Sequence, residues 1–218
     1  MNYRLLATPF FRRSGPCPRS SAGNSRTQSA PTKLGRAVFF ALAALPGFQA
    51  VAAQTQHRDP DTGAVNWETH AHGVTLSLTQ ILPDQARAFY LNRGFPPRAA
   101  ERYATACVYM TVLRNDAAPG ELSFRLADWT VQSEGQARPP KSVDEWAAQW
   151  RALGLAEAAR IAFRWAQFPP EQEYAVGEWN QGMLTTGLPP GGRFDLIARW
   201  TVAGKPYEGK LENVVCAR

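Results

Sequence analysis

A run of alternating apolar and polar residues near the C-terminus constrains the fold of this 218-residue chain more than any other feature. The run covers residues 194–202 (FDLIARWTV), and the turn sequence AGKP at 203–206 leads into a second extended run at 207–216. Alternation with a period of two is typical of a strand with one buried and one exposed face. The segment therefore predicts a β-hairpin, and the apolar face of that hairpin needs a second layer of structure to cover it.

Weaker alternation along the chain predicts further strands, which we place at 74–79, 122–131, 161–165 and 182–187. Residues 106–115 are apolar on both faces, which is typical of a central strand. About seven strands result, so we expect a mainly β fold in which two sheets form a sandwich. The strand pattern resembles that of immunoglobulin-like sandwiches in exported bacterial proteins, and this resemblance implies a fold but no particular function.

One or two short helices are expected between the strands. Ser142 and Glu145 match a capping box, and Trp146 and Trp150 follow at helical spacing on one face. A shorter helix is predicted at 84–92, before Gly94.

The first 53 residues have the layout of a secretory signal peptide behind a long basic leader. Residues 37–45 (AVFFALAAL) are uncharged and apolar, basic residues precede them, and the small residues Ala50-Val51-Ala52-Ala53 follow. We expect cleavage after Ala52 or Ala53. The apolar run is shorter than the roughly 20 residues of a membrane span, so we expect no stable span after cleavage and a periplasmic or secreted protein. A retained anchor, an organelle transit peptide and a start codon placed too early are the alternatives.

The remaining chain divides into two parts. Residues 54–66 are rich in turn-forming residues and are predicted to be a flexible N-terminal tail. Residues 67–218 have the length of one ordinary domain and are expected to form a single β-sandwich.

The net charge of +6 comes entirely from the leader, because residues 1–53 hold seven basic residues and no acidic one. The rest of the chain has 17 basic and 18 acidic residues. A nucleic-acid-binding protein needs a basic surface to meet phosphates, so this class of function is excluded.

Two of the three cysteines, Cys107 and Cys216, lie in the part of the chain that follows the leader, whereas Cys17 lies within it. An even pair in an exported domain predicts a disulfide. The alternative is a pair of thiols that bind a metal or act as a redox couple, but no CxxC spacing supports it.

The three histidines are His57, His70 and His72. Two imidazoles at i and i+2 point to the same side of a strand, so His70 and His72 are candidate ligands for copper, with His57, Met110 or Met183 as a further ligand. The alternative is that both histidines are simply solvated.

No catalytic residues are predicted. None of the four serines after residue 53 lies in a G-x-S-x-G sequence, and all histidines lie near the leader. Six carboxylates are available for acid–base chemistry, but their spacing singles out no pair: Asp128, Glu171, Glu173, Glu178, Asp195 and Glu208.

The segment 177–196 (GEWNQGMLTTGLPPGGRFDL) is the least generic part of the chain. It predicts a binding surface formed by Trp179, Asn180, Gln181 and Met183, although an aromatic residue that closes the open end of a sandwich would have the same sequence. Exposure of Trp67, Trp129 and Trp179 on one face would favour the binding surface. The favoured hypothesis is an exported, non-enzymatic binding or accessory protein of the cell envelope without a cofactor, whose partner is an envelope protein or a glycan. The alternative is a periplasmic copper-handling protein that uses His70 and His72.

Overall fold

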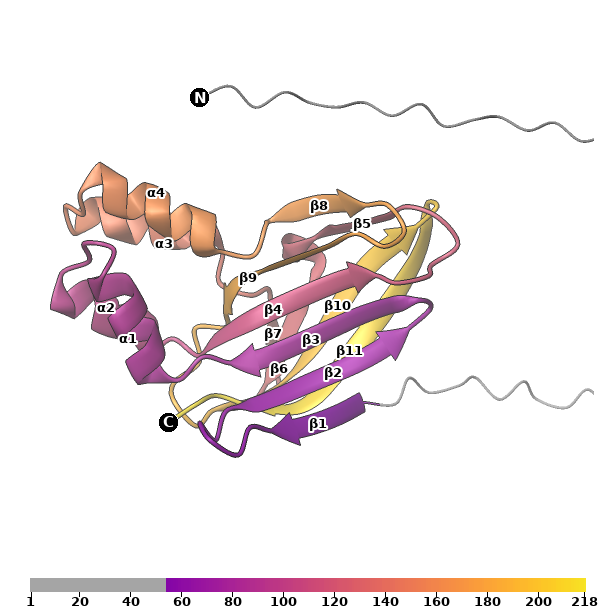
Figure 1. Ribbon diagram of the computed structural model, residues 1–218, viewed down its shortest axis with the longest axis horizontal. Helices are drawn as coiled ribbons and strands as arrows, with labels where there is room; N and C mark the ends of the chain where they lie inside the picture. The colour runs from indigo at the N-terminus through magenta and orange to yellow at the C-terminus, as the bar shows by residue number, and fades with distance from the viewer. Residues whose placement is uncertain (1–53) are drawn as a thin grey trace, which may run out of the picture. The chain divides into compact units, whose positions relative to one another are not determined.

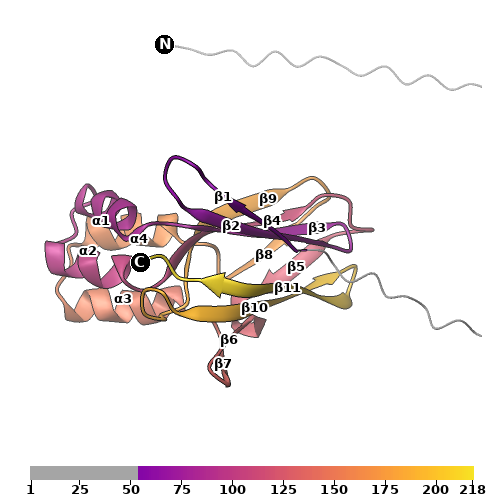
Figure 2. The ribbon, with the colours of Figure 1, turned by 90° about the horizontal axis from the view of Figure 1, so that it is seen from below.

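Residues 54–218 are described by a computed structural model, in which two antiparallel sheets lie face to face with four short helices at one end (Figure 1). Figure 2 shows the two layers from their edge. The predicted two-sheet sandwich with helical inserts is therefore confirmed. The predicted signal peptide, residues 1–53, lies outside the described residues.

The first sheet contains five strands in the order β1-β2-β3-β4-β9. Their bounds are β1 Gln54–Arg58, β2 Val65–Ala71, β3 Val74–Gln80, β4 Val108–Asn115 and β9 Trp179–Thr185. The first four strands follow each other along the chain as a meander, and β9 returns later to pair with β4. Strand β9 is thus one edge of this sheet.

The second sheet is built around β10. Its strands are β5 Leu122–Arg125, β6 Thr130–Ser133, β7 Gln136–Arg138, β8 Glu171–Tyr174, β10 Arg193–Val202 and β11 Lys205–Val215, with a short 3-10 helix, η1 Leu126–Asp128, after β5. Strand β10 pairs with β11 along one side and with β5 and β6 on the other, while β8 extends β5 and β7 extends β6.

The predicted C-terminal hairpin is present as β10 and β11. Ala203 and Gly204 form its two-residue turn, and both have positive φ angles, of 47° and 77°. A tight turn of this kind matches the twist of the two strands. Phe194, Leu196 and Trp200 are buried, as the alternation requires.

Residues 54–218 contain four helices where one or two were expected: α1 Pro83–Leu91, α2 Pro97–Ala104, α3 Val143–Ala152 and α4 Glu157–Ala166. The capping box of α3 is confirmed, because Ser142 Oγ accepts from Glu145 N at 3.1 Å and Glu145 Oε2 accepts from Ser142 N at 2.7 Å. The predicted strand at 161–165 is wrong. This segment belongs to α4, in which Ala159 and Phe163 face the core at a spacing of four residues.

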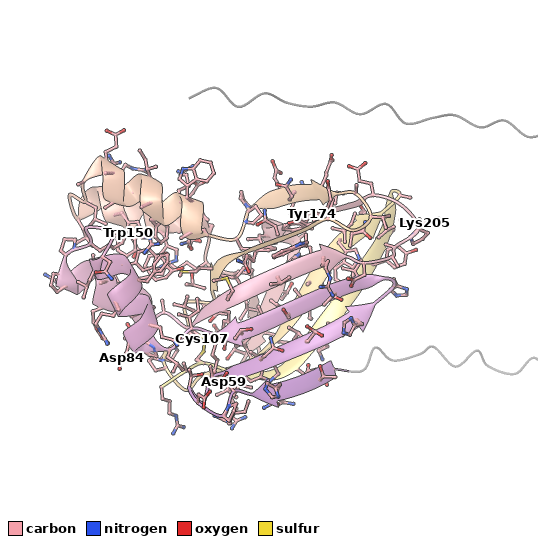
Figure 3. The ribbon with its side chains drawn as sticks, in the orientation of Figure 1. Asp59, Asp84, Cys107, Trp150, Tyr174 and Lys205 are labelled. Carbon is pink, nitrogen blue, oxygen red and sulfur yellow. A yellow bond between two sulfur atoms is a disulfide. The ribbon has the colours of Figure 1, made fainter. Side chains whose placement is uncertain are left out.

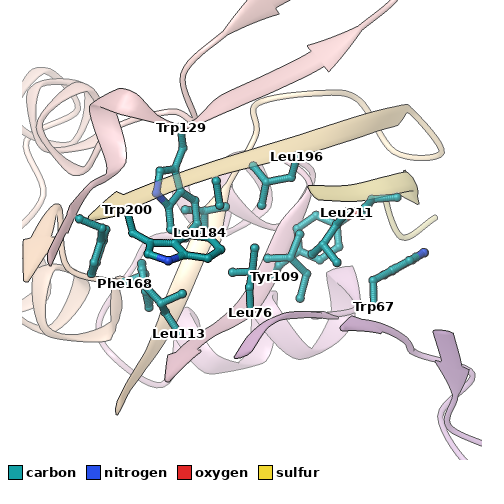
Figure 4. Packing of buried hydrophobic residues seen from close by; sticks show 14 of the residues in the cluster. Trp67, Leu76, Tyr109, Leu113, Trp129, Phe168, Leu184, Leu196, Trp200 and Leu211 are labelled. Atoms are coloured by element: carbon teal, nitrogen blue, oxygen red, sulfur yellow. The ribbon is translucent and has the colours of Figure 1, made fainter. Parts of the chain in front are cut away.

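Two apolar clusters form the interior. The first lies between the sheets, where Trp67, Leu76 and Tyr109 meet Leu196 and Trp200 (Figure 4). The second lies between the helices and one end of the first sheet; its largest side chains are Tyr90, Tyr103, Trp146, Trp150 and Phe163. Figure 3 labels Trp150 at this helical end.

The structure corrects the prediction of a flexible tail at 54–66. Residues 54–58 are strand β1, which pairs with β2, and the side-chain amide of Gln54 exchanges hydrogen bonds with the backbone of Glu212 on β11 at 3.1 and 2.5 Å. Nearly all side chains of residues 54–58 are exposed, and the strand is accordingly polar. Its pairing with β2 uses backbone groups, so it produces no alternation of apolar and polar residues.

The predicted disulfide between Cys107 and Cys216 is present, with the two Cα atoms 5.0 Å apart. Cys107 comes directly before β4 and Cys216 directly after β11, so the bond joins the first sheet to the second. None of the helices within residues 54–218 has the length and apolar character needed to span a bilayer.

Candidate binding surface on strand β9

The four residues predicted as a binding surface all lie on strand β9, but they do not share one environment. Trp179, Gln181 and Met183 alternate onto the outer face of the first sheet, and Asn180 lies on the other face. Trp179 is 51% exposed, whereas Met183 is only 5% exposed. Met183 is buried because the helices cover its end of the strand, and the hydroxyl of Tyr90 donates to its sulfur at 3.3 Å. Trp179 and Gln181 are therefore the exposed part of the set.

The helical end also covers the free edge of β9, but only over its last residues. The carbonyl of Met183 accepts from Phe168 N at 2.9 Å, and that of Thr185 accepts from Lys141 N at 2.9 Å. Both carbonyls point away from β4, and backbone groups two residues apart on a strand point the same way. The carbonyls of Gln181 and Trp179 therefore also point to this edge, and within residues 54–218 neither accepts a hydrogen bond.

The amide N–H of Gln181 points to the same edge and donates to the side chain of its own neighbour, Asn180, at 2.7 Å. This contact is local and leaves the β4–β9 ladder intact. The edge at Trp179 and Gln181 is consequently a short open stretch of strand with one half-exposed indole beside it.

A line of polar contacts crosses the outer face of the first sheet next to Trp179. Arg114 on β4 lies directly opposite Trp179, and its guanidinium donates to Asp116. The other oxygen of Asp116 accepts from the hydroxyl of Thr75, which is also 2.7 Å from His70 Nδ1. The sheet thus brings His70, Thr75, Arg114 and Trp179 into one cross-strand row.

The placement of the two histidines differs from the prediction. His70 ends the exposed face of β2, with Nδ1 at Thr75 and Nε2 2.9 Å from Glu68 Oε1, so both ring nitrogens have protein partners. His72 lies beyond the end of β2 in a turn, with a positive φ of 54°, and its ring centroid is 4.6 Å from that of Tyr207. The argument that both imidazoles share one strand face is therefore wrong, because the strand ends between them.

Two of the further ligands considered for copper, Met110 and His57, are also separated from His70. Arg114 lies in the same cross-strand row as His70. Met110 is four residues from Arg114 along β4, a distance of about 13 Å at the rise of an extended strand. His57 lies on β1 opposite Asn66, which is four residues from His70 along β2. Within residues 54–218 no three His, Cys, Asp or Glu side chains are grouped in a way that suits a metal ion. Copper binding remains a prediction from the sequence.

A second surface feature, which sequence spacing did not reveal, is a cleft of about 890 Å³ on the outer face of the second sheet. Strand pairing brings Asp128, Glu171 and Glu173 to this cleft, three of the six carboxylates considered for catalysis. All three are exposed, and Asp128 is paired with Arg125 at 3.0 Å. A glycosidase-type acid sits in a buried, apolar setting, which none of these groups has.

Three tryptophans, at positions 67, 129 and 179, do not form a common platform. Trp67 and Trp129 are each 1% exposed and belong to the sandwich core, where Trp129 Nε1 donates to the carbonyl of Arg199 at 3.0 Å. The exposed tryptophan that the sequence analysis missed is Trp165 on α4, which is 87% exposed. Its assignment to a strand concealed the helical spacing of Ile161 and Trp165.

Comparison with known proteins adds no relative: no family model, no curated protein and no solved structure matches this chain significantly.

Proposed function

We propose that this protein is an exported, non-enzymatic binding protein of the cell envelope that captures an extended segment of a partner protein at the open edge of β9. The observation that carries the proposal is the half-exposed Trp179 beside the unpaired carbonyls of Trp179 and Gln181. An exposed edge pairs readily with an added strand, and an aromatic side chain beside it supplies an anchor.

Two features support export. A disulfide persists in oxidising compartments, and the bond between Cys107 and Cys216 joins the two sheets. The sequence of the first 53 residues has the layout of a signal peptide.

The surface around Trp179 suits a protein partner. Val176, in the turn before β9 and three residues from Trp179, is a second exposed apolar side chain, with 56% exposure. Gln181 is exposed on the same face as Trp179, and Arg114 lies opposite it, so polar groups border the apolar ones. An apolar centre with a polar rim is typical of protein interfaces.

Two variants separate the anchor from the edge. Trp179→Ala removes the indole, and Gln181→Pro blocks the edge with a ring while sparing the β4–β9 ladder, because the Gln181 N–H is not used in that ladder. Trp165→Ala is the matched control, since it removes an exposed indole from a different element. A photo-cross-linking residue at position 178 would capture the partner in cells that naturally make the protein.

We expect one defined cross-linked protein, which is lost in Trp179→Ala and in Gln181→Pro and kept in Trp165→Ala. A cross-link that survives both β9 variants, each with unchanged thermal unfolding, contradicts the proposal. Binding of an envelope oligosaccharide that is lost in Trp179→Ala but kept in Gln181→Pro would replace the peptide partner with a glycan.

A further inference from the structure

Helix α4 is apolar on two opposite faces. Ala159 and Phe163 are buried in the cluster between the helices and the first sheet, whereas Ile161 and Trp165 are 51% and 87% exposed. Because successive residues of an α-helix are about 100° apart, Ile161 and Trp165 lie on the side opposite the buried pair. We call this side, defined by Ile161 and Trp165, the outer face of α4. The packing of residues 54–218 therefore leaves a second apolar face of this helix open.

Basic side chains border the outer face of α4. Arg160 and Arg164 each precede one of its apolar residues along the helix, and both line the groove between α3 and α4 together with Arg151 of α3. Among the described residues that line this groove, Glu157 is the only acidic one. Asp144 lies 3.6 Å from Arg164 and is 89% exposed. The arginines outnumber the carboxylates even when both acids are counted, so this surface carries an excess of positive charge.

Exposed tryptophan bordered by arginine is typical of a protein surface that contacts lipid. Tryptophan is enriched where the hydrocarbon of a bilayer meets its headgroups. The stem of an arginine lies along apolar surface while its guanidinium reaches the polar layer, where it matches a phosphate group with two hydrogen bonds. A helix with this division of side chains lies flat in the interface and is attracted by anionic lipids.

The shape of the surface favours a bilayer over a folded protein partner. The groove between α3 and α4 has a volume of only about 260 Å³, and the indole of Trp165 is almost fully exposed rather than packed into it. Protein interfaces centre on well-packed pockets that exclude water. A bilayer receives protruding side chains without a complementary pocket, which is what the outer face of α4 offers.

We propose that the outer face of α4 docks the protein on a membrane surface that contains anionic phospholipids. Ile161 and Trp165 enter the boundary between headgroups and acyl chains, and Arg151, Arg160 and Arg164 meet the lipid phosphates. The contact is peripheral, because the opposite face of α4 stays in the protein core. This docking does not depend on the function proposed for the edge of β9.

Tryptophan fluorescence can follow the docking, because all of the seven tryptophans except Trp165 and Trp179 are at most 3% exposed. Only these two indoles are open to a quencher carried by lipid. We expect vesicles of equal parts phosphatidylglycerol and phosphatidylcholine with brominated acyl chains to quench the emission of the purified, disulfide-bonded protein. Quenching should be lost in Trp165→Ala and kept in Trp179→Ala.

Vesicle flotation tests the charges and the second apolar residue. Arg160→Gln/Arg164→Gln should weaken association with the anionic vesicles about 30-fold, since each arginine at such a surface contributes about fivefold. The control Arg98→Gln/Arg102→Gln removes two exposed charges at the same spacing from α2, outside the groove, and should weaken association less than about threefold. Ile161→Ser should weaken it about tenfold. Vesicles of phosphatidylcholine alone should bind at least about tenfold more weakly than the anionic vesicles.

All variants keep the same first 53 residues, so differences among them report on the changed side chains alone. Several results would overturn the proposal: no association with anionic vesicles, equal association with both kinds of vesicle, equal losses in the two arginine pairs, or quenching that survives Trp165→Ala. A photo-cross-linking residue at position 161 that captures an envelope protein, while vesicles do not bind, would assign the outer face of α4 to a protein partner and likewise overturn it. Unchanged thermal unfolding of the variants establishes that a loss of binding does not come from a loss of the fold.

Discussion

The hydroxyl of Tyr109 on β4 donates a hydrogen bond of 2.8 Å to the backbone carbonyl of Val215, the last residue of β11. The side-chain amide of Gln80 donates to the same carbonyl at 2.6 Å, and the next residue, Cys216, is bonded to Cys107. The end of the last strand is therefore held to the first sheet by one covalent bond and two hydrogen bonds. This arrangement explains why β11 contacts both sheets at the edge of the sandwich.

Removal of the disulfide should destabilise the fold without abolishing the apolar packing. The bond closes a loop with a sequence separation of 109 residues. We expect the Cys107→Ala/Cys216→Ala double variant to lose about 2–5 kcal/mol in free energy of unfolding, measured by urea titration with tryptophan fluorescence. Mass spectrometry of the alkylated, non-reduced native protein should find neither thiol modified. Two alkylated thiols would contradict the bond.

The hydrogen bond from Tyr109 should contribute a smaller amount. Tyr109→Phe removes one donor from the Val215 carbonyl, but Gln80 still satisfies that carbonyl, so we expect a loss of about 1 kcal/mol in urea unfolding. Tyr207→Phe is the control, since no hydrogen bond of its hydroxyl is found within residues 54–218. Equal losses in both variants would show that the Tyr109 contact has no specific role.

Stability should fall at alkaline pH because four tyrosines are buried. Burial raises the pKa of Tyr90, Tyr103, Tyr109 and Tyr174 above the ordinary value. The pKa of each buried tyrosine is higher in the folded state than in the unfolded state, where it is about 10. The contribution of the protonated tyrosine to stability is therefore complete below pH 10 and is lost as the pH rises further. Each tyrosine should then contribute a decline of up to about 1.4 kcal/mol per pH unit.

Urea midpoints between pH 8 and pH 11.5 would measure this decline, and Tyr109→Phe should make it shallower. Tyrosinate absorbance from all four residues that rises before the protein unfolds would contradict the prediction.

Gly182 on β9 should not tolerate a side chain. A Cβ atom at this position would overlap the backbone nitrogen of Phe168, which bonds to the neighbouring Met183 carbonyl. We expect Gly182→Ala to cost about 1–3 kcal/mol in thermal or urea unfolding, because the strand and the segment that follows α4 have to separate. Gln181→Ala, at the exposed neighbouring position, should change stability by less than about 0.5 kcal/mol. Equal stability of the two variants would argue against the close contact.

The elements predicted from sequence are those whose pattern is local and long. The hairpin of β10 and β11 combines nine alternating residues with a recognisable turn, and Ser142 with Glu145 marks the start of α3. Two of the strands that escaped detection, β1 and β7, are short and polar. Their pairing uses backbone groups and does not require apolar side chains. Over five residues, Ile161, Phe163 and Trp165 fit a strand, while the four-residue spacing of Ile161 and Trp165 also fits a helix.

The candidate surface on β9 was predicted only in part. Alternation along the strand follows from the sequence, but the burial of Met183 depends on helices that are distant in the chain, such as α1, whose Tyr90 is 93 residues before Met183. The position of His72 was likewise not predicted, because its separation from His70 depends on where β2 ends.

The sequence alone determined the sandwich, its C-terminal hairpin and the cysteine pair. Alternation is a local pattern of residue types, and two cysteines in one domain can form only one disulfide with each other. Only the tertiary structure decided which residues of β9 stay exposed, and that His70 and His72 do not share one strand face. Burial and unmet hydrogen bonds depend on neighbours that are distant in the chain, and no local pattern records them.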